Sequence, residues 1–314
     1  MRVLVTGASG FLGSHICEAL AGAGFEVWGA SRGKGYLCEI EGVNWKYLDI
    51  SSVDSVFSFD FSPFDVVVHN AGLTFSRREA NYFKINHLGT RLLVERLKQQ
   101  GFTGRLIHIS SLAVCGPGSK REDDPVICPI TPYGVSKYMG ELEVRASNLN
   151  WVVLRPPVIF GERDRALIGV YRIFSKGLVF AWNPPKRISI VYAGNVAAAV
   201  RFAMERDLMG EVLFVKDADI RWEEFALKVQ EILGVKRRLT VPLRNWMLEP
   251  AKVAAHLLGN LLKLPLDRHK IEEIRAKEWI AASNRILELG FEAPFTFEEG
   301  LERTLKWCMI RGYI

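Results

Sequence analysis

Tyr133 and Lys137 form a Tyr-x-x-x-Lys pair that could carry out acid–base chemistry. Residues four apart lie on one face of a helix, so a phenol and an ammonium would face the same site. A nearby cation favours the phenolate and lowers the pKa of a tyrosine from its usual value of about 10. The pair therefore predicts that Tyr133 acts as a general acid and base between a carbonyl and an alcohol. The alternative is a solvated helix face, where the same spacing is common.

The first residues have the arrangement that dinucleotide-binding proteins use. A short β-branched run, residues 2–6, leads directly into a glycine-rich turn, and an amphipathic stretch follows. Strand, turn and helix together are the context that such a site requires, because the glycines let the backbone approach the pyrophosphate at the helix N-terminus. A glycine-rich loop without a ligand is the alternative. The residues expected to hold the cofactor here are Gly7, Ser9, Gly10, Phe11, Leu12 and Gly13.

The Gly-x-x-Gly-x-x-Gly spacing, combined with Tyr-x-x-x-Lys, resembles the extended short-chain dehydrogenase/reductase superfamily, the NAD-dependent epimerase/dehydratase family. The resemblance covers nearly the whole chain. Further segments that match the family pattern are residues 66–72 (VVVHNAG), 85–90 (INHLGT), 108–116 (HISSLAVCG) and 154–164 (LRPPVIFGERD). One departure is Cys115, which stands where the family usually has tyrosine and puts a contact with the substrate in doubt.

The resemblance implies roles for residues in these segments. Ser111 corresponds to the catalytic hydroxyl that binds the substrate oxygen, and Tyr133 to the residue that transfers the proton. Lys137 would lower the tyrosine pKa and hold the nicotinamide ribose, while Asn86 would support the helix and a proton-relay water. The remaining expected cofactor contacts are Asp49, Ile50, Asn70, Ala71, Gly72, Pro156 and Val158.

Two positions indicate which branch of the superfamily the chain resembles. Residues 190–199 (IVYAGNVAAA) resemble a segment of the 3β-hydroxysteroid dehydrogenase branch, with Asn195 where many sugar-nucleotide enzymes carry aspartate. In those enzymes an asparagine holds the diphosphate at the position of Val158, and a valine cannot donate hydrogen bonds to it. An NDP-sugar epimerase or dehydratase with tightly bound NAD stays open as an alternative. A non-catalytic NADP-binding sensor is a third, although such proteins usually lose the tyrosine or the lysine.

The type of nicotinamide cofactor is indicated at the end of the second expected strand. NAD enzymes normally place an acidic residue there for the ribose 2′-hydroxyl, whereas NADP enzymes supply a cation for the 2′-phosphate. Here Ser31 and Arg32 stand at this position and Lys34 follows. The sequence therefore favours NADP. NAD is the alternative, with Arg32 stacked on the adenine.

The expected substrate wall is mostly apolar, which favours a hydrophobic secondary alcohol or ketone, with a steroid-like compound as one option. The residues expected to form this wall are Thr74, Leu112, Pro157 and Tyr192. Residues 246–264 have apolar side chains at helical spacing. This segment is interpreted as a helix packed on the core, as a lid, or as a peripheral membrane contact.

Composition and pattern predict an α/β protein with a doubly wound parallel sheet and a smaller, mostly helical C-terminal lobe. The expected domains are residues 1–155 plus about 188–215 for the dinucleotide, and residues 156–187 and 216–314 for the substrate. No signal peptide or membrane-spanning run is expected, and the scattered cysteines suggest reduced thiols in the cytoplasm rather than a metal site. The net charge of +6 gives no reason to expect a nucleic-acid partner. Family analogy leaves a homodimer open, formed by the helices around residues 88–98 and 133–145.

Overall fold

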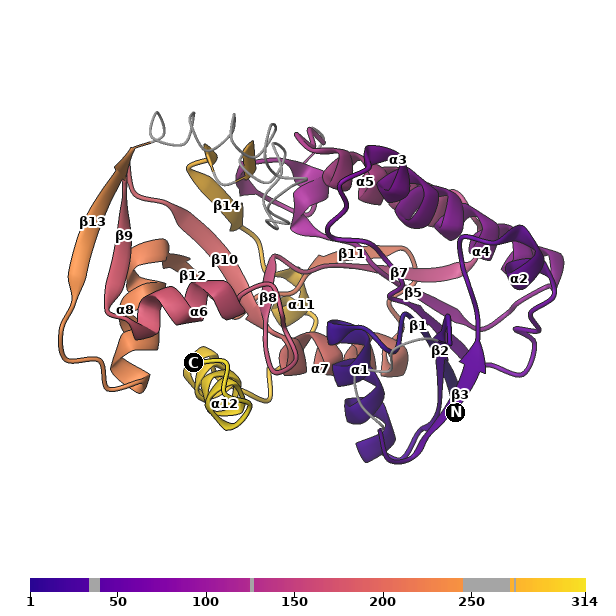
Figure 1. Cartoon of the computed structure of the whole chain (residues 1–314). Helices are drawn as coiled ribbons and strands as arrows, with labels where there is room; N and C mark the ends of the chain where they lie inside the picture. Colours follow the sequence, from indigo (N-terminus) through magenta and orange to yellow (C-terminus); the bar gives the residue numbers. More distant parts are fainter. Residues whose placement is uncertain (34–39, 125–126, 245–271, 274) are drawn as a thin grey trace.

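The computed structural model describes residues 1–33, 40–124, 127–244, 272–273 and 275–314 (Figure 1). Its larger sheet is parallel throughout, which confirms the predicted doubly wound fold. The strands at its centre are largely buried and rich in apolar residues, as expected where helices cover both faces. The order across the sheet is β11 (Glu211–Phe214), β7 (Asn150–Arg155), β5 (Arg105–Ile109), β4 (Val66–His69), β1 (Arg2–Thr6), β2 (Glu26–Ser31) and β3 (Val43–Tyr47).

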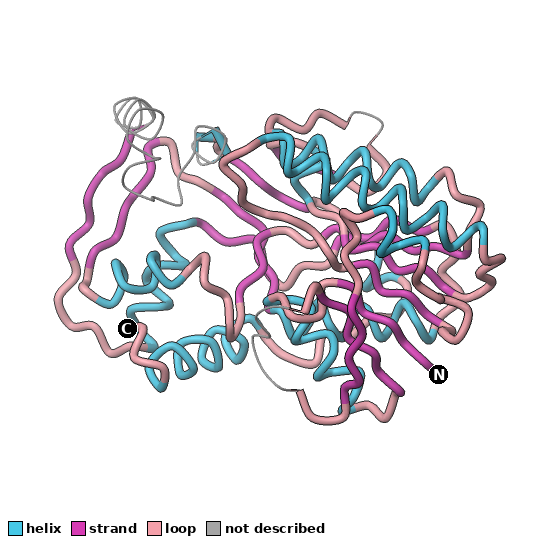
Figure 2. Tube along the Cα trace, turned by 45° about the vertical axis from the view of Figure 1, so that its right-hand side comes forward, coloured by secondary structure: helices cyan, strands magenta, loops and turns pink. Residues whose placement is uncertain are grey.

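Helices form a layer on each side of this sheet (Figure 2). On one side α1 (Phe11–Gly22) packs against α7 (Ala193–Glu205), and their apolar side chains meet those of Val3 and Val5. The other side carries α2 (Val53–Phe57), α3 (Glu79–Tyr82), the π-helix η1 (Phe83–Leu88), α4 (Gly89–Gln99) and α5 (Pro132–Arg145). The alternation of side chains along each strand thus separates two cores, one under each helical layer.

A second sheet lies beside the first and builds most of the smaller lobe (Figure 1). Its strand order is β12 (Ala218–Arg221), β10 (Arg187–Tyr192), β14 (Glu278–Ala281) and β6 (Gly118–Lys120), with β8 (Val158–Phe160) also paired to β10. A separate pair joins β9 (Leu178–Asn183) to β13 (Leu239–Arg244). The helices of this part are α6 (Ile168–Ser175), α8 (Trp222–Ile232) and α12 (Phe297–Ile310), whereas α11 (Arg285–Glu288) contacts β11 and buries Ile286 in the core of the larger sheet.

The lobe differs from the sequence expectation in two ways. It is a mixture of strands and helices rather than mostly helical, because β-branched and aromatic runs such as residues 187–192 form strands. In addition, β10 belongs to the second sheet, whereas the predicted boundary at about residue 188 placed it with the dinucleotide domain. Among the described residues after β10, α7, β11 and α11 pack with the larger sheet. Residues 246–264 lie outside the described residues.

A buried ion pair fastens α5 to the sheet. Arg155, the last residue of β7, donates from Nε to Glu141 Oε2 at 3.0 Å and from Nη2 to Glu141 Oε1 at 2.5 Å. The Ser110 hydroxyl, just after β5, donates to Glu141 Oε2 at 2.8 Å. The Arg155 side chain is 2% exposed and that of Glu141 is fully buried. The Arg155 and Glu141 charges therefore neutralise each other inside the protein, because water cannot reach either group.

We expect Glu141→Gln to lower the free energy of unfolding by about 3–5 kcal/mol, because it leaves the Arg155 guanidinium buried without a counter-charge. Urea denaturation followed by circular dichroism measures the change. The control is Glu95→Gln, which removes an exposed pair with Arg91 and should cost about 0.5 kcal/mol or less. Equal effects of the two substitutions would contradict a special role for the buried pair.

Candidate active site

The two catalytic candidates on α5 are positioned by the start of that helix. Thr131 is the N-cap residue, and its Oγ1 accepts from the Gly134 backbone N–H at 3.1 Å. Pro132 occupies the first helical turn, where its missing N–H costs nothing. Tyr133 therefore lies in the first turn, and Lys137 follows one turn later on the same face. The helix comes close to η1, since a Cβ on Gly140 would lie 2.2 Å from the Asn86 carbonyl oxygen.

The Ser111 hydroxyl lies close enough to the Tyr133 phenol to lower its pKa, so the fold brings together two residues that lie far apart in the sequence. Ser111 is also the N-cap of the short 3-10 helix η2 (Leu112–Cys115), and its Oγ accepts from the Ala113 N–H at 3.1 Å. The serine follows β5, so its hydroxyl lies at the carboxyl end of the parallel sheet, where ligands bind in doubly wound folds.

The protonation of Tyr133 differs from the sequence expectation. Burial raises the pKa of this phenol to about 12, although the nearby Ser111 hydroxyl acts in the opposite direction. Lys137 instead donates from Nζ to the Ile109 carbonyl oxygen at 2.6 Å. Burial also lowers the pKa of Lys137 to about 8. The expected lowering of the tyrosine pKa is thus absent among the described residues, because desolvation of the phenolate outweighs the stabilising contacts.

Asn86 fixes the segment between β4 and the site. Its Oδ1 accepts from the Leu73 N–H at 2.7 Å, while Nδ2 donates to the Leu73 carbonyl oxygen at 3.0 Å and to Ser136 Oγ at 3.0 Å. The residue is 1% exposed and belongs to η1, and π-helical turns are frequent at functional sites. Asn86 therefore supports both the loop after β4 and the helix of Tyr133. Its part in a water relay stays a prediction.

The glycine turn after β1 fits a dinucleotide. Gly7 has φ +67°, and a Cβ there would lie 2.7 Å from the Ala71 Cα. A Cβ on Gly13 would lie 2.2 Å from the Gly7 carbonyl oxygen, so neither position accepts a side chain. Among the described residues, no side chain caps the N-terminus of α1. The backbone N–H groups of its first helical turn therefore have no side-chain acceptor and face the glycine turn. Ser9, Gly10 and Phe11 are half-buried along the turn, whereas Leu12 is buried in the core.

The expected adenosine end of the site lies at the ends of β2 and β3. Arg32 is exposed, and Ser31 is buried with its Oγ accepting from the Gly33 N–H at 3.4 Å. Asp49 is half-buried and holds its own turn, because its Oδ1 accepts from the N–H and the hydroxyl of Ser51 at 2.9 and 2.8 Å. Ile50 is buried below it. Lys34 lies outside the described residues.

The loop after β4 joins these parts. Asn70 donates from Nδ2 to the Gly7 carbonyl oxygen at 3.4 Å, and the Ala71 N–H donates to Thr6 Oγ1 at 3.1 Å. Gly72 is exposed and close to the catalytic helix, since a Cβ there would lie 3.8 Å from Lys137 Nζ. The structure thus places residues 70–72 between the glycine turn and the catalytic candidates.

The expected substrate wall is only partly accessible. Thr74 is exposed and Pro157 is half-buried. Leu112 and Tyr192 are each 3% exposed. Leu112 packs with Val114, Cys115, Phe214 and Ala281, so its side chain does not form an open wall.

Tyr192 is likewise a core residue. Its ring lies 5.8 Å from that of Phe160, centroid to centroid, and its hydroxyl donates to the Glu162 carboxylate at 2.8 Å. Pro156 is buried, and its carbonyl oxygen accepts from the Leu112 N–H at 2.9 Å. Val158 is half-buried in β8, opposite Ile190 of β10.

One residue at the site has no counterpart in the sequence expectations. Glu273 accepts from Thr131 Oγ1 at 3.3 Å, and its negative charge contributes to the raised pKa of Tyr133. It is separated from the catalytic helix by more than a hundred residues, and it belongs to no motif that could have identified it.

Two features are absent from the part of the chain that the structure describes. No group of three or more histidine, cysteine, aspartate or glutamate side chains is placed as metal ligands would be. Within the same residues, no helix has the length and apolar character needed to cross a membrane.

Comparisons with known proteins show which proteins are similar to this chain. A relative from Caulobacter vibrioides, a ceramide reductase, is 24% identical over 99% of this chain and 96% of its own length. A second relative, from Escherichia coli O157:H7, is 24% identical with the same coverage. It is named as an N-acetyl-alpha-D-glucosaminyl-diphospho-ditrans,octacis-undecaprenol 4-epimerase.

The fold is found in solved structures as well. A UDP-glucose 4-epimerase from Thermotoga maritima, solved with UDP-glucose, superposes with a TM-score of 0.77 at 22% identity. The alignment covers 99% of each chain. Residues 3–214 match the model of the NAD dependent epimerase/dehydratase family. The chain therefore belongs to this family, the extended short-chain dehydrogenase/reductases.

Proposed function

We propose that the protein transfers a hydride between a nicotinamide and a secondary alcohol or ketone of an apolar substrate, through Ser111, Tyr133 and Lys137. The observation that carries this proposal is the proximity of Ser111 to Tyr133, close enough to lower the pKa of the phenol, which places two hydroxyl groups together at the end of the parallel sheet. Two O–H donors at one point are what a carbonyl oxygen needs as it becomes an oxyanion. The half-buried Tyr133, whose pKa is raised to about 12, keeps its proton at neutral pH and can donate it.

Each of the three residues has a separate role in the proposed reaction. Ser111 donates to the substrate oxygen, and Tyr133 donates to it and passes its proton to the forming alkoxide. The bound nicotinamide supplies the hydride for reduction or accepts it for oxidation. Lys137 has three N–H donors, of which one is engaged by the Ile109 carbonyl oxygen. The other donors would hold the nicotinamide ribose.

An apolar substrate agrees with the accessible residues near the site. Pro157 and Val158 are half-buried, and Phe75, next to the exposed Thr74, is 38% exposed. A relative with the same coverage is named as a ceramide reductase, so reduction of a lipid occurs within the family. The 3β-hydroxysteroid dehydrogenase-like branch stays part of this proposal.

An NDP-sugar epimerase with tightly bound NAD is the second candidate, since another relative of equal coverage has an epimerase name. Val158 is an argument against the epimerase, because a valine side chain cannot donate a hydrogen bond to a diphosphate. Native mass spectrometry of freshly purified protein separates the two candidates. Near-stoichiometric NAD that survives buffer exchange would favour the epimerase, whereas a freely exchanging site would support the dehydrogenase. The predicted homodimer would be seen in the same spectrum.

We expect Arg32→Asp to reduce the preference for NADPH over NADH, measured as a ratio of kcat/KM values, by about tenfold or more. The substitution removes a cation and places a carboxylate near the 2′-phosphate, and tenfold corresponds to about 1.4 kcal/mol. Arg311→Asp is the control, because Arg311 is an exposed residue after α12. An unchanged ratio in the Arg32 variant would refute the proposed preference for NADP.

We expect Tyr133→Phe to lower turnover by about 10²–10⁴-fold, the usual contribution of a general acid or base. Nucleotide binding should change less than about threefold, as measured by fluorescence titration. Tyr138→Phe is the matched control, because Tyr138 is in the same helix and packs beside the cluster of Leu112. A Tyr133 variant with wild-type turnover would show that the mechanism is wrong.

A further inference from the structure

Tyr82 packs directly against Tyr133, the residue proposed to transfer the proton. Its ring lies 6.2 Å from the Tyr133 ring, centroid to centroid, and the two ring planes are inclined at 61°. Aromatic pairs prefer edge-to-face arrangements of this kind, so the contact favours one orientation of both rings. Tyr82 is 4% exposed and belongs to α3, the short helix that lies beside α5 (Figure 1). The orientation of the Tyr133 phenol therefore depends on a second, buried ring.

The hydroxyl of Tyr82 fixes the loop that follows β4. Its oxygen accepts from the Ser76 N–H at 2.9 Å. The other fixed point of the loop is Leu73, whose main-chain N–H and carbonyl oxygen are both hydrogen-bonded to the buried asparagine of η1. Between these two points lie Thr74, which is exposed, and Phe75, which is 38% exposed. The two exposed residues are thus held from both ends.

This part of the loop lies beside the proposed reacting groups. Gly72, just before it, is close to the catalytic helix, since a Cβ there would lie 3.8 Å from Lys137 Nζ. At the other end, Ser76 is bonded to the tyrosine that packs on Tyr133. A ketone whose oxygen is bound by Tyr133 would therefore present the groups next to its carbonyl to the two exposed loop residues.

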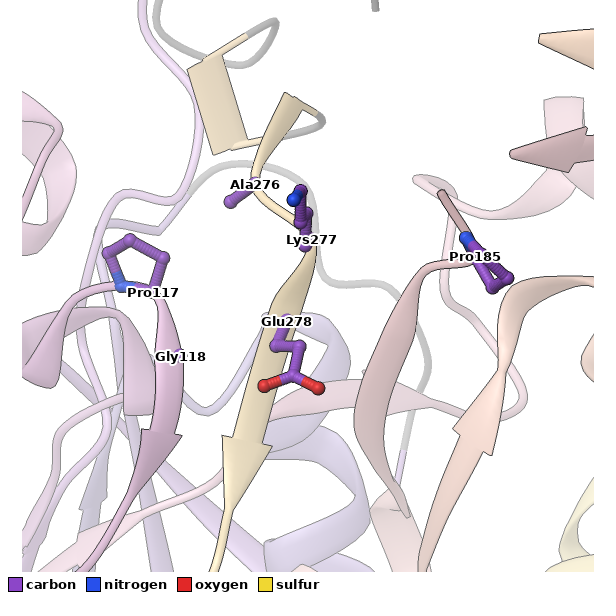
Figure 3. A pocket seen from close by; sticks show the side chains of 6 residues that line it. All are labelled: Pro117, Gly118, Pro185, Ala276, Lys277 and Glu278. Carbon is purple, nitrogen blue, oxygen red and sulfur yellow. The ribbon is translucent and has the colours of Figure 1, made fainter. Parts of the chain in front are cut away.

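The hollow in the smaller lobe is a separate feature. It has a volume of about 460 Å³ and lies where the starts of β6 and β14 and the turn before β10 come together (Figure 3). Its lining consists of Pro117, Gly118, Pro185 and residues 276–278. None of the three proposed catalytic residues belongs to this lining. Among the described residues it is therefore the loop after β4, and not this hollow, that adjoins the reacting groups.

We propose that Tyr82 is a positioning residue of the reaction, because its ring orients the Tyr133 phenol and its hydroxyl holds residues 73–76 against the substrate. This inference rests on the proposed function and adds a determinant of substrate binding to it. The two tasks belong to different parts of one side chain. Removal of the hydroxyl affects the loop alone, whereas removal of the ring affects the phenol as well.

The test measures kcat and KM for octan-2-one, with saturating NADPH or NADH, in two variants. Tyr82→Phe keeps the ring but removes the acceptor of the Ser76 N–H. We expect it to raise KM by about 3–10-fold and to leave kcat nearly unchanged, which corresponds to one hydrogen bond of ordinary strength. Tyr82→Leu removes the ring too, and we expect kcat to fall by about 10–100-fold because the phenol is misplaced. Nucleotide affinity, measured by fluorescence titration, should be unchanged in both variants.

Tyr171→Leu is the matched control for the loss of a buried ring. Tyr171 is fully buried in the smaller lobe, and its ring meets that of Phe225 with nearly the same geometry, 6.3 Å between centroids and 57° between planes. Its substitution should leave kcat and KM per folded molecule unchanged. Circular dichroism and nucleotide binding give the folded fraction of each variant, and Tyr171→Phe is the control for the hydroxyl.

Other outcomes overturn the inference in recognisable ways. Wild-type kcat and KM in both Tyr82 variants would refute it, whereas a loss of folded protein with unchanged constants per folded molecule would show a structural role only. If Tyr82→Leu does not fold, an unchanged KM in Tyr82→Phe still refutes the contact through the loop. None of these results touches the proposed function. That function fails if the wild-type protein reduces neither octan-2-one nor any other ketone with either nucleotide.

Discussion

The buried ion pair between Glu141 and Arg155 is the constraint on which the site depends. It joins the middle of the catalytic helix to the end of β7, and Ser110 adds the end of β5 to the same carboxylate. Ser111 follows Ser110 directly, and Tyr133 and Lys137 lie on the helix of Glu141. A shift of that helix by one turn would leave two charges inside the protein without partners, which costs several kcal/mol. The relative positions of the three catalytic candidates are thus set by electrostatics in the core.

A layer of neutral polar groups continues this arrangement beneath α4 and α5. His69 is fully buried and hydrogen-bonds Thr6 Oγ1 at 2.9 Å and Thr90 Oγ1 at 3.0 Å. Burial lowers its pKa to about 3, with Lys137 as a further cause. His108 stacks beside it at 5.3 Å, and both of its ring nitrogens are without a hydrogen-bond partner among the described residues. Burial lowers the pKa of His108 as well, so both imidazoles are neutral and the positive charge beside them is that of Lys137.

The parts of the site that could be predicted from the sequence are those fixed by short-range geometry. Gly7 and Gly13 have no space for a side chain, and the spacing of Tyr133 and Lys137 places them on one helix face. The parts that could not be predicted depend on packing between distant segments. Leu112 and Tyr192 have suitable types for a substrate wall but are buried in clusters, and Glu273 reaches the site from the far end of the chain. The same reason applies to β10, whose pairing partners lie in other parts of the chain.

The pKa of Tyr133 shows why residue spacing alone is insufficient to assign a catalytic role. Spacing places a cation near the phenol, and that alone would favour the phenolate. The structure adds two opposing effects, because the phenol is desolvated and the Glu273 carboxylate lies close enough to disfavour a second negative charge. Together they keep the proton on the oxygen, which is the form required to protonate a ketone as it is reduced. Alcohol oxidation would have to begin from the rarer phenolate. The charge distribution around Tyr133 therefore favours the protonated phenol over the phenolate.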